Sequence, residues 1–84
     1  MEGIILEKAI SSEKVVRMIE AENLLCFETD RKVRKKTIQK EVEELFNVKV
    51  QDVKTLTRGN KKRAYVKLKP EFIAADVATK IGIL

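Results

Sequence analysis

The sequence predicts an α+β fold in which a small, mostly antiparallel four-stranded sheet carries helices packed on both faces. Segments with helical spacing of apolar residues alternate with segments of strand character, in the order β-α-β-α-β-β-α. One strand segment is apolar at both alternating positions, so it needs cover on both faces of the sheet. With 84 residues and no repeat or Gly/Ser-rich linker, the chain is expected to form a single domain over 1–84.

The first part of the chain is expected to supply a strand, a helix and the central strand. Residues 4–6 are a short apolar run, typical of an edge strand or an extended arm. A helix is predicted over about 12–22, because the hydroxyl of Ser12 can cap it and Glu13 favours the positive end of its dipole. The segment 24–29 follows, and its apolar residues at both alternating positions indicate a central strand.

The segment 33–46 shows the clearest helical pattern. Ile38, Val42 and Leu45 lie at i, i+4 and i+7, and Phe46 extends the same stripe. This helix is basic at its start and acidic at its end, which is the reverse of what the helix dipole favours. A binding partner at the basic end would explain the conflict.

The second part is expected to form a hairpin and a last helix. Residues 48–50 alternate as a strand, and a β-bulge near 51–52 restores the inward phase that the pattern loses there. A turn over 58–61 leads to a return strand over 64–69, where apolar and polar residues alternate. A final helix is predicted over 71–80, after the proline that ends the strand.

Composition argues against several classes of protein. No histidine is present, so the usual acid/base group at neutral pH is missing, and a lone cysteine cannot form an internal disulfide. Cys26 lies among apolar residues and is expected to be a buried small side chain. Glu41, Glu43 and Glu44 are expected to form a solvated helix face rather than a metal site. We therefore expect no enzyme activity, no cofactor, no metal, no signal peptide and no membrane insertion.

The positive charge is concentrated in the middle of the chain. The net charge is +5, but residues 1–30 hold seven acids and three bases, while residues 31–69 hold fourteen bases and four acids. The first basic cluster comprises Arg31, Lys32, Arg34, Lys35 and Lys36. The second basic cluster comprises Arg58, Lys61, Lys62 and Arg63, and Asn60 is expected to join them in the hairpin contact. Each cluster is a candidate phosphate-binding patch, although a run of lysines can also be ordinary solvated surface.

The aromatic residues favour recognition of RNA by charge and shape. The three phenylalanines fit apolar stripes, and Tyr65 alone alternates outward with Lys67 and Lys69 on the return strand. Tyr65 can stack on a base or be packed under a helix, and both alternatives stay open. Lys67 and Lys69 are expected to support the second basic cluster. The alternative function is a basic protein-interaction module that binds an acidic protein partner. A preference for folded RNA over heparin would favour RNA binding over this alternative.

An ordered set of motifs carries a family resemblance from about residue 4 to the end of the chain. The motifs are Ser12-Glu13-Lys14, Asn23 to Phe27, Asp30-Arg31-Lys32, Val42 to Phe46, Val48-Lys49-Val50, Gly59 to Arg63 and Ala64 to Leu68. With these motifs the chain resembles the large-subunit ribosomal protein twenty-three family, the universal family beside the nascent-peptide exit tunnel. The short hairpin loop and the ending at 76–83 resemble the archaeal-type members.

The resemblance implies a structural constituent of the large ribosomal subunit that binds ribosomal RNA and offers a docking platform for targeting factors. The implied partners are ribosomal RNA, neighbouring large-subunit ribosomal proteins, the signal recognition particle and the protein-conducting channel, and the implied location is the cytoplasmic ribosome. In bacterial relatives the Glu of the Ser-Glu-Lys motif helps to dock a ribosome-bound chaperone. Glu13 matches that residue, and Glu20 and Glu22 belong to the same acidic region.

The chain departs from the family pattern at the start of its second helix. Arg34 stands where the family often has a capping Thr, and Lys36 stands where Pro is common. These residues weaken the helix cap and add positive charge, so they favour phosphate contact at that end.

Overall fold

The structure, a computed structural model, describes residues 6–10 and 12–83. Its elements follow the predicted order and are β1 (Leu6–Ala9), α1 (Glu13–Glu22), β2 (Leu24–Asp30), α2 (Lys35–Phe46), β3 (Val50–Arg58), β4 (Lys61–Leu68) and α3 (Ala74–Lys80). The strands form one four-stranded sheet in the order β1-β2-β4-β3, and every neighbouring pair is antiparallel. The predicted α+β class is therefore confirmed.

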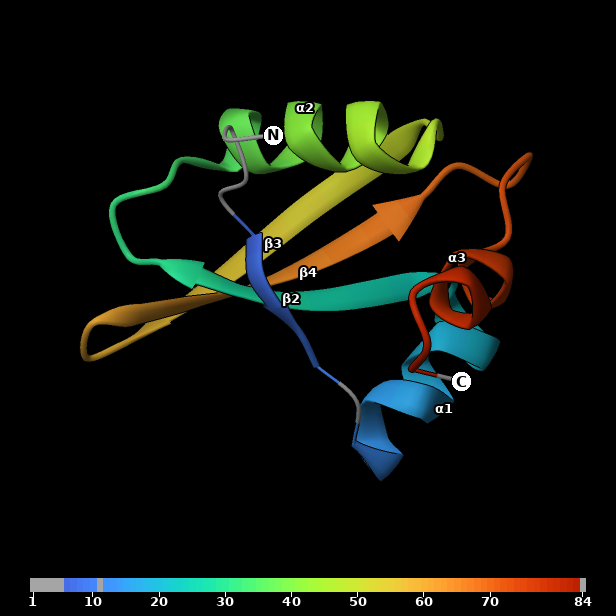
Figure 1. Ribbon diagram of the computed structural model, residues 1–84, viewed down its shortest axis with the longest axis horizontal. Helices are drawn as coiled ribbons and strands as arrows, with labels where there is room; N and C mark the ends of the chain where they lie inside the picture. The colour runs from blue at the N-terminus through green and yellow to red at the C-terminus, as the bar shows by residue number, and fades with distance from the viewer. Residues whose placement is uncertain (1–5, 11, 84) are drawn as a thin grey trace.

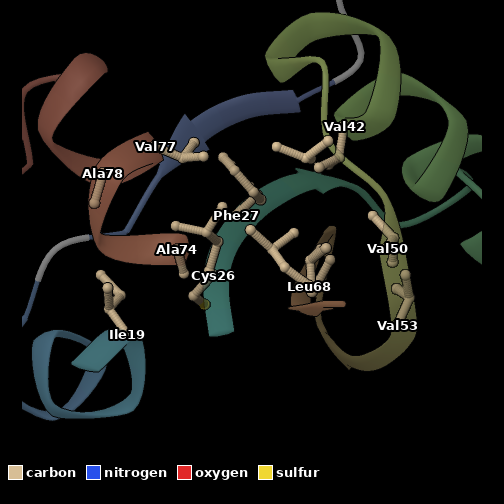
Figure 2. Close-up of a cluster of buried hydrophobic side chains, with 14 of the residues drawn as sticks. Ile19, Cys26, Phe27, Val42, Val50, Val53, Leu68, Ala74, Val77 and Ala78 are labelled. Carbon is tan, nitrogen blue, oxygen red and sulfur yellow. The ribbon is translucent and has the colours of Figure 1, made fainter. Parts of the chain in front are cut away.

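Helices cover both faces of this sheet. Figure 1 shows α2 above the strands, with α1 and α3 together on the opposite side. Phe27 of β2 stacks on Phe46 of α2, with ring centroids 5.8 Å apart. Its neighbour Cys26 points to the other layer, where Ile19 of α1 and Ala74 of α3 surround it (Figure 2). Because both side chains are buried, the prediction of a central strand covered on both faces is confirmed.

Local chemistry formed several elements as expected. The Ser12 hydroxyl accepts a hydrogen bond from the Val15 amide at 3.3 Å and caps α1. Arg58 pairs with Lys61 across the β3–β4 hairpin, and Gly59 between them has φ +57°, a conformation that side chains with a Cβ rarely adopt. The register between β3 and β4 shifts between 50 and 52, where the bulge was predicted.

Two element boundaries differ from the prediction because backbone groups find partners outside the element. The second helix begins at Lys35 rather than at 33, since the Val33 amide donates to the Asp30 carbonyl in a turn. The third strand begins at Val50 rather than at 48, because Asn47 ends α2 in a left-handed conformation with φ 56°. In the first strand, residues 4 and 5 lie outside the described residues, and β1 extends over Leu6–Ala9.

The last helix is shorter at its start than predicted. It begins at Ala74 rather than at 71, because the Asn23 side chain holds the preceding segment. Its Nδ2 donates to the Phe72 carbonyl at 2.8 Å, and its Oδ1 accepts from the Ala74 amide at 2.7 Å. A residue 51 positions away thus sets where this helix begins.

Candidate functional site

The structure brings the two basic clusters together at one end of the sheet. Strand β2 pairs with β4 in a register that places Asp30 opposite Lys61, so the end of β2 lies beside the start of the hairpin's second strand. The Arg31 amide donates to the Asn60 carbonyl at 3.3 Å. In Figure 1 the β2–α2 loop and the hairpin tip accordingly lie at the same end of the molecule. Two clusters separated in sequence thus form one surface, which we call the basic end.

The first basic cluster is carried by a tight turn and the first residues of α2. The Asp30 side chain accepts a hydrogen bond from the Lys32 amide at 2.9 Å, and this shapes the turn after β2. Arg34 occupies the N-cap position of α2 without a side-chain cap. No acidic residue lies in the first turn of the helix, and all five basic side chains of the cluster are exposed. The positive helix end and five cations therefore favour an anion at this place.

The second basic cluster surrounds the hairpin tip and its two faces. Arg58, Asn60 and Lys61 are exposed at the tip. The next two residues along β4 are half-buried and point to opposite faces of the sheet, because side chains alternate along a strand. Lys62 lies on the α2 side, and Arg63 lies on the side of Cys26 and Glu28. The cluster is thus distributed around the hairpin.

Lys67 and Lys69 lie away from the basic end. Lys67 is six residues beyond Lys61 on β4, a separation of about 20 Å at roughly 3.3 Å per residue. Lys69 follows the end of β4, where its amide donates to the Lys49 carbonyl. Both side chains are exposed, but the structure does not bring them to the second basic cluster. Any RNA contact they make belongs to a separate surface.

A groove of about 490 Å³ lies between α1 and the β3–β4 hairpin. Met18, Leu24 and Tyr65 supply its apolar lining, and charged side chains that include Lys54 and Lys67 also line it. Tyr65 is half-buried, lies opposite Cys26 on the neighbouring strand and packs against the core, so it is a partly packed side chain. The sequence analysis did not single out Lys54, because this residue lies outside both basic clusters. The alternation of side chains along β3 could have indicated that Lys54 lies on the same face of the sheet as Tyr65.

Cys26 is buried, as the sequence predicted. Burial raises the pKa of its thiol, and the nearby positive charge of Arg63 opposes this effect. A thiol with a raised pKa in an apolar layer is a poor nucleophile, because little of the reactive thiolate is present near neutral pH. The role of Cys26 is therefore packing.

The acidic residues predicted for partner docking are all exposed on α1. Glu13 and Glu20 are seven residues apart and share the outward face of the helix, where Glu13 pairs with Arg17 at 3.3 Å. Glu22 lies toward the groove and is part of its wall. Figure 1 places α1 at the end of the molecule opposite the hairpin tip, so the acidic and basic regions are separated.

The three acidic residues of α2 do not act as one group. The Glu43 carboxylate accepts a hydrogen bond from the Val50 amide at 2.9 Å and so fixes the start of β3, which corrects the expectation of a solvated side chain. One carboxylate oxygen of Glu41 is buried. Within 6–10 and 12–83, no group of three or more Cys, Asp or Glu side chains is arranged to hold a metal ion. None of the helices in this part of the chain is long and apolar enough to span a membrane.

Comparison with known proteins identifies a family. The sequence profile of the family described as "Ribosomal protein L23" matches residues 4–75. A curated relative from Methanococcus aeolicus, called "Large ribosomal subunit protein uL23", is 45% identical over 80 residues, which cover 94% of this chain and 93% of the relative. The relative comes from a methanogenic archaeon, which supports the archaeal type indicated by the short hairpin loop.

Proposed function

The chain belongs to the ribosomal protein L23 family, and we propose that it is a structural constituent of the large subunit that binds ribosomal RNA near the nascent-peptide exit. Membership of this family makes the chain a ribosomal protein of the cytoplasm and not an enzyme. The RNA part of the proposal is carried by one observation, the joining of two sequence-distant basic clusters into the basic end.

The physical basis for RNA binding is the release of counterions. Each cation that neutralises a phosphate frees ions condensed on the nucleic acid, so a dense group of cations gives affinity without reading bases. The basic end combines an exposed loop, a helix start without acids and a hairpin tip, and it presents cations in several directions. Such an arrangement suits a folded RNA, whose phosphates curve around a protein, better than a single extended strand.

A gel-shift titration tests the RNA proposal. The probe is a fragment of large-subunit ribosomal RNA at several salt concentrations, with unrelated structured RNA and heparin as competitors. The double variants Arg58→Glu/Lys61→Glu and Lys35→Glu/Lys36→Glu reverse charge within each cluster, and Lys14→Glu/Lys80→Glu makes the same change on α1 and α3. We expect binding that resists both competitors and collapses only in the first two variants.

The opposite result would favour the alternative function. If heparin displaces the labelled ribosomal RNA from the natural chain as readily as unlabelled ribosomal RNA does, specific RNA binding is contradicted. The basic end would then be the surface of a protein-interaction module with an acidic protein partner. Equal loss in all three double variants would likewise contradict the assignment of the site to the basic end.

We further propose that the outward face of α1 receives targeting factors, while the basic end holds the RNA. The support is the family resemblance at Glu13, together with the exposure of Glu13 and Glu20 on a helix far from the hairpin tip. The signal recognition particle and the protein-conducting channel are the proposed partners, beside neighbouring large-subunit ribosomal proteins. Acidic side chains on one helix face can steer a basic partner surface.

Co-sedimentation of purified signal recognition particle with ribosomes tests the docking proposal. Ribosomes carrying Glu13→Lys/Glu20→Lys are expected to bind several-fold less particle than those carrying the natural chain. Glu71→Lys, an exposed acid in the turn before α3, is the matched control and should bind normally. Normal binding to the α1 variant would exclude this helix face as the docking site.

A further inference from the structure

We propose that Lys62 is a positioning residue that holds the first basic cluster against the second, and is not itself a phosphate contact. This inference rests on the RNA-binding function proposed above and assigns one cation of the second cluster a different task. Lys62 is half-buried, unlike Arg58 and Lys61 at the tip. Its Nζ donates to the Val33 carbonyl at 2.6 Å, which is short for a hydrogen bond from an ammonium group.

The direction of the Lys62 side chain explains how it reaches the loop. In the sheet, Lys62 lies opposite Thr29 of β2 on one side and Thr57 of β3 on the other. Its stem therefore starts on the α2 face of the sheet, while the ammonium lies beneath the loop that connects β2 to α2. Val33 is half-buried and packs against the core, so the bond from Lys62 joins the hairpin to the part of the loop that meets the core.

The hydrogen bonds between the loop and the hairpin include one between backbone groups and one from a side chain. The Arg31 amide donates to the Asn60 carbonyl, a backbone contact that a substitution can weaken only indirectly, by letting the loop move. The bond from the Lys62 Nζ to the Val33 carbonyl is made by a side chain, so a substitution removes it directly. The position of the loop relative to the hairpin therefore depends on this lysine in a way that mutagenesis can test.

The hydrogen bond from Lys62 to Val33 is important because the two basic clusters repel each other. The first cluster carries five cations, and they lie beside the cations of the hairpin. Like charges at such close range push the loop and the hairpin apart unless other contacts resist. Lys62 adds a positive charge to this surface, but its ammonium is bound to a carbonyl oxygen and holds the two parts in place.

The salt dependence of RNA binding separates a positioning residue from a phosphate contact. Arg58→Met removes one exposed cation and is expected to reduce the slope of log affinity against log salt by about 1, the value for one lost phosphate contact. Lys62→Met keeps the apolar stem but loses the bond to Val33. We expect its slope to fall by clearly more than that of Arg58→Met, with an affinity loss of about tenfold or more. Lys62→Arg keeps a donor and is expected to restore most of the affinity.

A double-mutant cycle is a second test of the proposed role of Lys62. Lys35→Gln/Lys36→Gln removes two cations of the first cluster and should weaken RNA binding of the natural protein. In the Lys62→Met background the same change should cost much less, because the displaced cluster no longer contacts the RNA together with the hairpin. Additive losses, with a Lys62→Met slope equal to that of Arg58→Met, would overturn the proposal and make Lys62 an ordinary phosphate contact.

Amide hydrogen exchange of the free protein tests the positioning role without RNA. In the natural chain the amides of Arg31 and Val33 are hydrogen-bonded, and we expect Lys62→Met to accelerate their exchange several-fold. Amides in the middle of β2, such as Phe27, serve as the internal control and should not change. Unchanged exchange at 31 and 33 would overturn the inference even if RNA binding were lost. Faster exchange in a protein that does not bind RNA would instead contradict the proposed function and leave the positioning role intact.

Discussion

A single amide side chain, that of Asn23, joins three elements. Asn23 ends α1 in a left-handed conformation with φ 59°, and its backbone amide donates to Met18 of that helix. Its Nδ2 also donates to the carbonyl of Leu68 at the end of β4, and its side chain makes the two bonds that set the start of α3. Buried polar groups that lose such partners are costly, so this residue contributes far more than a helix cap.

We therefore predict that Asn23→Ala lowers the free energy of unfolding by about 3 kcal/mol or more, measured by urea denaturation. Asn47→Ala is the matched control, because Asn47 has the same left-handed backbone at the end of α2 but an exposed side chain. It should lose about 1 kcal/mol, the cost of placing alanine in that conformation. Equal losses in the two variants would mean that the side-chain bonds of Asn23 are worth little.

Cys26 predicts a pH dependence of stability. Because burial raises its pKa in the folded state, the thiol keeps its proton to a higher pH than it does in the unfolded chain. The contribution of this thiol to the free energy of unfolding is complete below the ordinary pKa of 9.0. It is lost as the pH rises above that value, because the thiol then ionises in the unfolded chain before it does so in the folded protein. Urea titrations between pH 8 and pH 10 should show a steeper fall in stability for the natural chain than for Cys26→Ala. Parallel curves would contradict the raised pKa.

At the scale of elements, the residues at the start of α2 add positive charge but stabilise the helix less than a capping residue would. Arg34 stands at the N-cap without a capping side chain, whereas Ser12 caps α1 in the usual way. The helix also has basic residues in its first turn and acidic residues near its end, against its own dipole. A hydroxyl at position 34 would cap the helix, so we attribute the arginine there to the RNA binding proposed above rather than to the helix.

Replacing Arg34 by Thr is expected to raise stability and weaken RNA binding together. The new hydroxyl can accept a hydrogen bond from an amide of the first turn, for a gain of about 1 kcal/mol in thermal or urea unfolding. Removal of one cation should lower RNA affinity a few-fold in the gel-shift titration. Ser12→Ala is the opposite control, since it should lose about 1 kcal/mol of stability without affecting RNA binding. A loss of stability in Arg34→Thr would show that the arginine supports the helix itself.

At the scale of the whole molecule, charge is polarised along the sheet. The basic end lies at the hairpin, and the acidic outward face of α1 lies at the other end of the fold (Figure 1). Crowding of cations destabilises the free protein through repulsion, and the same crowding attracts the polyanion that relieves it. Binding of the proposed RNA partner is therefore expected to stabilise the folded state by mass action.

This polarity predicts opposite effects of salt on the free protein and on its complex. Raising NaCl from about 50 to 200 mM screens the repulsion at the basic end and should increase the melting temperature of the free protein. The same change should lower RNA affinity and reduce the stabilisation that RNA provides. Lys35→Gln/Lys36→Gln carries less repulsion and should show a smaller salt effect when free. A free protein whose melting temperature falls with salt would contradict this account.

Local chemistry explains which features the sequence could predict. The Ser12 cap, the hairpin at Gly59 and the bulge after Val50 depend on neighbours a few residues away, and each was predicted correctly. The apolar stripe predicted on α2 is buried at Ile38 and Val42, whereas Leu45 is 41% exposed. The order of the elements and the two-sided cover of β2 follow from the same periodic patterns. The family resemblance also lay in short motifs, and the comparisons confirmed it.

The tertiary structure decided everything that depends on strand register. Only the pairing of β2 with β4 brings Arg31 beside Asn60 and Lys62 beside Val33, and the same pairing leaves Lys67 far from the hairpin tip. The late start of α3 depends on Asn23, which lies far away in sequence. Local spacing along the chain was therefore enough to predict the order of the elements, most of their buried faces and the two basic clusters. That the clusters form one surface was decided by contacts between distant residues, which no local pattern encodes.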